Sequence, residues 1–217
     1  MLKTGIFGGT FDPFHLGHVA VAKAFIQQMA LDELFIIPAA NTPLKHSFLF
    51  SFEQRLKMAE LALADLPQAI ISDMDATGSQ KSYTIELISR FVQKYPQREI
   101  YFAIGEDNVA QLKEWKDYKQ LLNMVKFVVF TRNTNNRDER TQLDYMDQLL
   151  FQKMPPIDIS ATEIREKLIN NEDVSLLLPR SIHPLIDDFK QSDAFKHFLL
   201  DQKRIINNDN KKHKLED

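Results

Sequence analysis

The sequence contains no cysteine, and this absence is the first of several that restrict what the protein can be. Without thiols the chain forms neither a disulfide framework nor a thiolate metal site. Long apolar runs are missing too: none approaches the length of a membrane-spanning helix, and the start, MLKTGIFGGT, lacks the apolar segment of a signal peptide. We therefore expect a cytoplasmic protein without a membrane partner.

An excess of charge of one sign is also absent. The 27 Lys and Arg residues stand against 30 Asp and Glu, which gives a net charge of −3 and a pI near 6.1. A general nucleic-acid binder favours a basic face, so we expect no nucleic-acid partner, although a small basic pocket is compatible with these numbers. The 217 residues, 44% of them hydrophobic, are sufficient for one sizeable core.

Short apolar runs alternate with stretches of helical period along the chain. The predicted strands are 4–7, 34–37, 69–71, 100–104 and 127–130. The predicted helical stripes are Val19, Ala22, Phe25, Ile26 and Met29; Leu56, Ala59, Leu63 and Leu66, behind a capping box at Ser51 and Gln54; and Ile85, Ile88, Phe91 and Val92. This alternation predicts an α/β fold with a doubly wound, mostly parallel sheet.

The two ends of this pattern suggest a division of the chain. We predict one principal domain over residues 1–190 and a C-terminal helical extension over residues 191–217 that ends in a frayed tail. Within the principal domain the polar stretch Arg132 to Asp147 is predicted to be a loop with a short helix.

The most informative segment is GGTFDPFHLGH, residues 8–18, which directly follows the first predicted strand. Ligands of such sheets bind at the carboxyl ends of the strands, where glycines allow close backbone approach and positive φ. His15 and His18 fall on the first turn of the following helix, and residues three apart face the same way. Two imidazoles beside backbone N–H groups can donate hydrogen bonds to phosphate. The alternative is that both histidines merely cap the helix or face solvent.

This segment resembles the GxFDPxHxGH loop of the nucleotidyltransferase superfamily whose signature is (H/T)xGH. With GGTFDP and two histidines it is similar to the bacterial nicotinate-nucleotide adenylyltransferases. The resemblance extends from Lys3 to about Asp188 and implies a Rossmann-like nucleotidyltransferase fold with a small C-terminal helical part. It implies that His15 and His18 are catalytic at the α- and β-phosphates. It assigns to the substrate site the loop residues Gly8, Gly9, Thr10 and Phe11.

A second motif, DISATEIR, occupies residues 158–165. It predicts a strand end and then a helix with Ser160 as its N-cap, so that the helix amides and Thr162 face an anion and Arg165 binds phosphate. The alternative is an ordinary capped helix with a surface arginine. The segment resembles the family's ISSTxIR element, which holds the ATP phosphates, but Ala161 replaces its second serine. The resemblance implies a catalytic role for Arg165 and a place for adenine near Ile159.

Three further elements resemble parts of the family's substrate site. Ser82, Tyr83 and Thr84 match an SYT element that touches the pyridine nucleotide, with Thr84 also a candidate helix cap. Gly105, Asp107 and Trp115 match a GxD element followed by a tryptophan that stacks on the pyridine ring; the alternatives are a helix N-cap for Asp107 and a core or lid position for Trp115. Lys45, in the loop after the second strand, is a candidate for the phosphates, with a solvated lysine as the alternative.

The resemblance implies transfer of the adenylyl group of ATP to nicotinate mononucleotide in NAD biosynthesis, with Mg²⁺ held mainly by the ATP phosphates and Asp107 contacting it through water. Alternative substrates are nicotinamide mononucleotide and phosphopantetheine. Cytidylyltransferase activity, a non-catalytic nucleotide-binding module and a tRNA-ligase fragment are the more distant alternatives. The sequence leaves the oligomeric state open and is compatible with a homo-oligomer.

Overall fold

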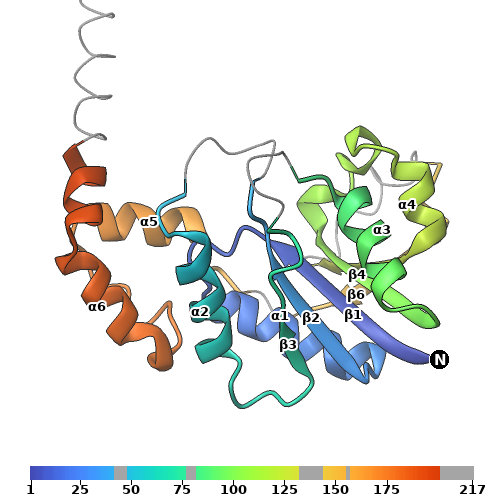
Figure 1. The fold of residues 1–217 in the computed structure, drawn as a ribbon, viewed down its shortest axis with the longest axis horizontal. Helices are drawn as coiled ribbons and strands as arrows, with labels where there is room; N and C mark the ends of the chain where they lie inside the picture. The colour runs from blue at the N-terminus through green and yellow to red at the C-terminus, as the bar shows by residue number, and fades with distance from the viewer. Residues whose placement is uncertain (42–47, 77–81, 132–143, 155–156, 201–217) are drawn as a thin grey trace, which may run out of the picture.

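The computed structural model describes residues 1–41, 48–76, 82–131, 144–154 and 157–200 of the chain. Six strands form one sheet in the order β3-β2-β1-β4-β5-β6, and every pairing is parallel (Figure 1). The strands are β1 (Leu2–Gly9), β2 (Glu33–Pro38), β3 (Ala69–Ile71), β4 (Arg98–Gly105), β5 (Lys126–Thr131) and β6 (Leu149–Lys153). Because all pairings are parallel, the six carboxyl ends share one edge of the sheet. The strand order reverses between β1 and β4, which places the switch point at the centre of that edge.

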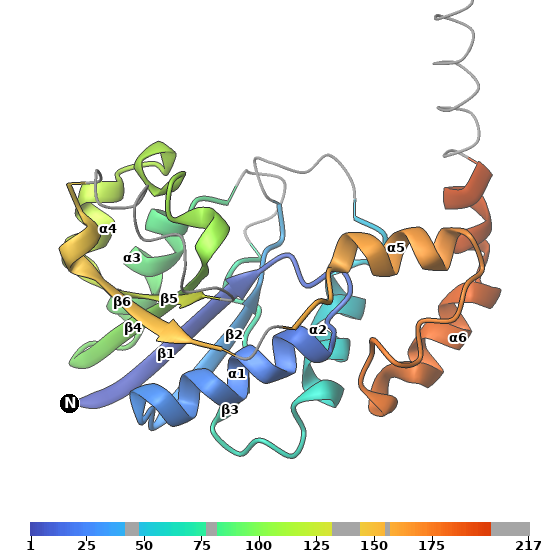
Figure 2. The ribbon, with the colours of Figure 1, turned by 180° about the vertical axis from the view of Figure 1, so that it is seen from behind.

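Helices cover both faces of the sheet, which explains why its central strands are continuously apolar. The helices are α1 (Leu16–Met29), α2 (Phe52–Ala62), α3 (Thr84–Lys94), α4 (Tyr118–Met124), α5 (Ala161–Ile169) and α6 (His183–Gln191). One hydrophobic cluster joins the sheet to α1, α2, α5 and α6, and a second joins it to α3 and α4. Figure 2 shows the sheet and its helices from behind, with α5 and α6 at the far side of α1 and α2 from the sheet's β6 edge. The α/β doubly wound prediction is confirmed.

Several details differ from the predictions. β6 and α4 were not predicted, and β6 is an edge strand whose Phe151 is 37% exposed. The capping box of α2 is present, with Ser51 Oγ accepting from the Gln54 N–H at 3.2 Å. The buried face of α2, however, is formed by Arg55, Met58 and Ala59, and Leu56 is only half-buried.

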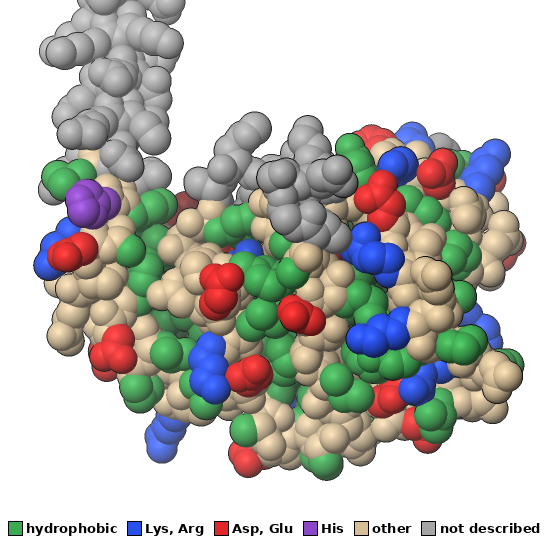
Figure 3. Space-filling view, in the orientation of Figure 1, with side chains coloured by type: hydrophobic (Ala, Val, Ile, Leu, Met, Phe, Trp, Pro, Cys, Tyr) green, Lys and Arg blue, Asp and Glu red, His purple; other side chains and the backbone are tan. Residues whose placement is uncertain are grey.

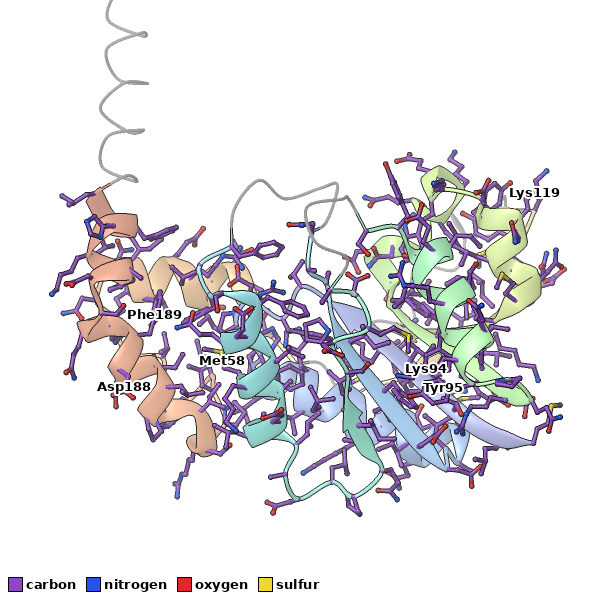
Figure 4. The ribbon with its side chains drawn as sticks, viewed as in Figure 1. Met58, Lys94, Tyr95, Lys119, Asp188 and Phe189 are labelled. Atoms are coloured by element: carbon purple, nitrogen blue, oxygen red, sulfur yellow. The ribbon has the colours of Figure 1, made fainter. Side chains whose placement is uncertain are left out.

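The C-terminal helices pack on the outer side of α2. The ring of Phe189, on α6, lies 4.4 Å from that of Phe50 and 5.1 Å from that of Phe195. Figure 4 shows Phe189 on the side of α6 that faces α2, where Met58 lies. The domain boundary at residue 190 remains a prediction, and residues 201–217 lie outside the described part of the chain.

The opposite edge of the sheet, where the strands begin, has its own polar cluster. Glu33 forms an ion pair with Arg98, and the Thr4 hydroxyl donates to the same carboxylate at 2.6 Å. Basic and acidic side chains are interspersed over the face of the molecule seen in Figure 3. Among the described residues, no helix is both long and apolar enough to cross a bilayer.

Candidate active site

A cleft of about 580 Å³ opens at the switch point, above the separating ends of β1 and β4. Three segments contribute most of its walls: the end of β4, the first turns of α1 and the segment that leads into α5. The lining residues include His15, Gly17, His18, Val21, Gly105, Glu106, Asp107, Ile157, Ile159, Ser160 and Ala161. The position is where open α/β sheets bind their ligands.

The two histidines of the loop form a stacked pair at the start of α1. His15 is the N-cap residue and His18 lies in the first turn, with ring centroids 3.6 Å apart and planes inclined by 23°. The backbone N–H of His15 donates to Nδ1 of His18 at 3.2 Å. Because Nδ1 is the acceptor there, a neutral His18 ring carries its proton on Nε2, which leaves Nε2–H as a donor.

The surroundings of His18 favour that neutral form. Burial lowers the pKa of His18 well below 6.5, and the adjacent His15 lowers it further. The ring packs edge-on against Phe11 at 4.9 Å and lies 5.1 Å from the ring of Phe14. At neutral pH His18 is therefore an uncharged, oriented hydrogen-bond donor rather than a cation.

The glycines of the loop serve close packing, and the prediction of positive φ for them is wrong. Neither Gly8 nor Gly9 has a φ in the left-handed region. A Cβ on Gly9 would lie 2.9 Å from the ring of Phe11, and it is Phe11 that adopts the left-handed conformation, with φ of 48°. The missing side chain of Gly9 thus makes room for the ring that packs against His18.

Two buried charged residues that were not predicted hold this loop in place. Asp12 is fully buried and accepts hydrogen bonds from the N–H groups of Leu49 at 3.2 Å and Phe50 at 3.0 Å. Arg55 is 1% exposed and donates from Nη1 to the carbonyls of Thr10 and Ala39, each at 2.7 Å.

The charge balance of Arg55 follows from this environment. Burial lowers the pKa of Arg55, while the charge of Asp12 raises it and thereby favours the ionised guanidinium. The sequence carries one indication that Arg55 is buried, namely its spacing with Met58 and Ala59 on one helical face, but none of the loop that it holds.

The second motif, residues 158–165, contacts the first motif, residues 8–18, through Arg165. Ser160 caps α5, its Oγ accepting from the Glu163 N–H at 3.1 Å, as predicted. Arg165 is directed at the first loop: Nη1 donates to the Asp12 carbonyl at 2.8 Å and Nη2 to Thr162 Oγ1 at 3.0 Å. Its side chain is only 19% exposed, so it is not an ordinary surface arginine. The strand predicted directly before this helix is absent, because β6 ends at Lys153.

The segment that matches the pyridine element lies at the start of α3. Tyr83 is the N-cap residue and Thr84 the first residue of the helix, so the prediction that Thr84 caps the helix is wrong. Ser82 is tied to the chain after β2, where its N–H donates to the Asn41 carbonyl at 2.8 Å. The side chain of Tyr83 makes no capping hydrogen bond, and the Tyr83 carbonyl accepts from the N–H groups of Glu86 at 3.0 Å and Leu87 at 3.1 Å.

Trp115 follows the end of β4 and packs on the same side of the sheet as Tyr83. Its indole lies edge-on to the rings of Phe102 and Phe127, with centroids 6.4 and 6.2 Å away. Lys116, next in sequence, forms an ion pair with Glu86 of α3 at 2.7 Å. Neither Trp115 nor the Ser82–Thr84 segment is among the described residues that line the cleft, so the stacking role of Trp115 remains a prediction.

Lys45 and Asp107 are the residues predicted to contact phosphate and metal, respectively. Lys45 lies outside the described residues. Asp107 and Glu106 both line the cleft, and the described part of the chain holds no group of three or more His, Asp or Glu side chains that could bind a metal ion. This donor set suits an ion that arrives with phosphate ligands and completes its shell with water.

Comparison with known proteins agrees with this architecture. Residues 6–167 match the family described as cytidylyltransferase-like. Two solved structures of Plasmodium falciparum nicotinic acid mononucleotide adenylyltransferase, complexed with APC and with NaAD, superimpose with TM-scores of 0.70 and 0.69. Each covers 87% of this chain and 94% of its own at 19% identity, a likeness that establishes the shared fold. The fold and the family match together define a nucleotidyltransferase.

Curated relatives carry names that also specify a substrate. A protein of Clostridium tetani is 33% identical over 205 residues, which cover 87% of this chain and 98% of the relative. One of Oceanobacillus iheyensis is 35% identical over 182 residues, which cover 84% and 92%. Both bear the name "Probable nicotinate-nucleotide adenylyltransferase". The chain belongs to the cytidylyltransferase-like family and, within it, to the nicotinate-nucleotide adenylyltransferases.

Proposed function

We propose that the protein transfers the adenylyl group of ATP to nicotinate mononucleotide and releases pyrophosphate, a step of NAD biosynthesis. The observation that supports this most is the stacked pair of His15 and His18, which lines a cleft at the switch point and whose His18 Nδ1 accepts a backbone hydrogen bond. A 5′-phosphate oxygen of nicotinate mononucleotide bonds to the α-phosphorus as the bond from that phosphorus to the pyrophosphate oxygen breaks. Phosphate is already a competent nucleophile, so the reaction requires no general base and no covalent intermediate.

Catalysis then consists of positioning and charge neutralisation. We assign His18 to the α-phosphoryl group, where its donor meets the charge that develops in the transition state, with His15 beside it. Arg165, with Thr162 and the amides at the start of α5, is assigned to the β- and γ-phosphates, and Lys45 is assigned there from its position in sequence. The contact of Arg165 with the Asp12 carbonyl aims its guanidinium toward the loop of the first motif.

The start of α3, where Tyr83 provides no side-chain cap, supports selectivity for the nicotinate form. The free amides of a helix N-terminus and the positive end of its dipole favour a carboxylate over a neutral carboxamide. We place the pyridine carboxylate near Tyr83 and Thr84, and the ring beside Trp115. The adenine is assigned to the wall of the cleft formed by α1 and Ile159.

The site also suits Mg²⁺ bound to ATP. We propose that phosphate oxygens and water hold the ion, with Asp107 contacting it through water. Bound there, Mg²⁺ supplies positive charge that offsets the charge of the polyphosphate. The chain's own part is to present the Asp107 carboxylate at the cleft.

The test is pyrophosphate release from ATP and Mg²⁺, with nicotinate and nicotinamide mononucleotide assayed side by side. We expect turnover with the nicotinate form and much less with the nicotinamide form. Equal rates would retain the reaction and refute the selectivity assigned to α3. No release with either, from folded protein that binds ATP, would refute the proposed substrate, and phosphopantetheine would be assayed next. Failure with all three would favour a non-catalytic nucleotide-binding module.

A further inference from the structure

A buried carboxylate outside the cleft connects three segments of the site. Asp75, in the turn after β3, is 2% exposed. Its Oδ2 accepts the N–H of Ala40 at 3.0 Å, its Oδ1 accepts the hydroxyl of Ser82, and the Arg90 guanidinium of α3 lies 3.5 Å from Oδ1. A carboxylate buried to this extent is costly unless hydrogen bonds and opposite charge offset its burial, and here two hydrogen bonds and one ion pair do so.

The partners of Asp75 belong to the parts of the chain that the proposed reaction uses. Ala40 follows β2, in a stretch that is also bonded to the first loop, since the Ala39 N–H donates to the Gly9 carbonyl at 2.8 Å. Ser82 begins the segment assigned to the pyridine nucleotide and is bonded by its backbone to Asn41 at 2.8 Å. The chain directly after β3 is also bonded to β2, since the Ser72 N–H donates to the Ile36 carbonyl at 3.0 Å.

The hydroxyl of Ser82 is therefore engaged with Asp75 and directed into the protein. The resemblance of the Ser82–Thr84 segment to a substrate-binding element does not distinguish a ligand contact from a structural one, but this geometry does for Ser82. A segment that has to present helix amides to a ligand gains from an anchor of this kind, because connecting segments are otherwise more mobile than the elements they join.

We propose that Asp75 is a positioning residue for the pyridine nucleotide: through Ser82 and Ala40 it holds the start of α3 in register with the phosphate loop, without touching the substrate. The proposal rests on the proposed function, since it concerns the assigned pyridine segment. It predicts that loss of Asp75 impairs the pyridine nucleotide more than ATP, because His15, His18 and Arg165, the described residues assigned to the ATP phosphates, belong to α1 and α5.

The experiment compares wild type, Asp75→Ala, Ser82→Ala and the double variant, with Asp73→Ala as the matched control. Asp73 lies in the same turn as Asp75 but is exposed. The readouts are KM for nicotinate mononucleotide, KM for ATP, kcat and Tm. We expect Asp75→Ala to raise KM for nicotinate mononucleotide by about tenfold, as for a lost buried hydrogen-bond partner. KM for ATP, and both KM values of Asp73→Ala, should stay within about twofold of wild type.

The double variant separates positioning from general destabilisation. If Asp75 acts through Ser82, Ser82→Ala raises the same KM as Asp75→Ala. The KM increase of the double variant should then be close to the larger single increase and well below the product of the two single increases. Equal increases in both KM values, or unchanged KM values with only a lower Tm, would overturn the proposal. If Asp75→Ala does not fold, Asp75→Asn keeps the volume, and the same split in KM is required of it. A wild type without pyridine-nucleotide-dependent turnover would instead refute the proposed function.

Discussion

Replacing His18 with asparagine separates the two hydrogen-bonding functions of its ring. The Nδ1 of His18 accepts the His15 N–H at 3.2 Å, and an asparagine amide oxygen can take over that acceptor position. The Nε2–H donor, which we assign to the α-phosphoryl group, has no counterpart in asparagine. The substitution therefore tests the catalytic donor while retaining the contact that orders the first turn of α1.

The expected magnitude follows from the role of a single preorganised donor. Loss of one such donor in a dry site lowers kcat by about a hundred- to a thousandfold, or about 3–4 kcal/mol of transition-state stabilisation. The cost to folding comes from the ring contacts with Phe11 and Phe14 and should be about 1–3 kcal/mol.

The assay is single-turnover and steady-state pyrophosphate release, together with urea unfolding of the same preparations. His18→Gln, whose amide nitrogen can approach the Nε2 position, should retain more turnover than His18→Asn. A His18→Asn protein with turnover within about threefold of wild type would refute the assignment of Nε2–H to the reacting phosphate.

Three further outcomes are expected. The pKa of His18 is lowered in the folded state, so the unfolded chain binds that proton more readily. The free energy of unfolding should therefore fall as the pH drops below about 6.5, by up to about 1.4 kcal/mol per pH unit until the folded pKa is reached. Denaturant unfolding between pH 7.5 and 5 should show this component in wild type and lack it in His18→Asn. Gly9→Ala would place a Cβ 2.9 Å from the Phe11 ring and should cost about 1–3 kcal/mol of stability. In Gly8→Ala the added Cβ meets its nearest atom at 3.5 Å, so this variant should fold with near-normal Tm. Equal losses of stability in the two variants would contradict the packing role of Gly9. Trp115→Ala should raise KM for nicotinate mononucleotide and leave KM for ATP little changed, and equal effects on both substrates would show that the indole is structural.

Much of the fold was predictable because its central strands are buried on both faces. Such strands are continuous apolar runs, and 34–37 and 127–130 stand out in the sequence for this reason. β6 was missed for the converse reason. It pairs only with β5 among the described strands, and its sequence, LLFQK, has a short apolar run of which Leu150 and Phe151 are exposed, with no strict alternation. Burial, rather than hydrogen bonding, is what leaves a readable pattern.

The residues of the candidate site likewise divide into those that could be predicted from the sequence and those that could not. Residues that sit in a short contiguous motif, such as His15 and Ser160, were placed on the correct helix starts. Asp75 and Arg55 were missed because each has a partner far away in the sequence, Ala40 for Asp75 and Thr10 for Arg55, and a single sequence does not reveal which distant segments meet. The left-handed conformation of Phe11 was likewise invisible, since two glycines nearby were the more natural candidates.

The parallel arrangement of the strands gives the two edges of the sheet different tolerance to change. The cluster of Thr4, Glu33 and Arg98 lies where strands begin, a full strand length from the cleft. Substitutions there can alter thermal stability or surface charge without moving a substrate contact. Attachment chemistry or stabilising mutations for biotechnological use are therefore best directed to that edge, which leaves the carboxyl ends untouched.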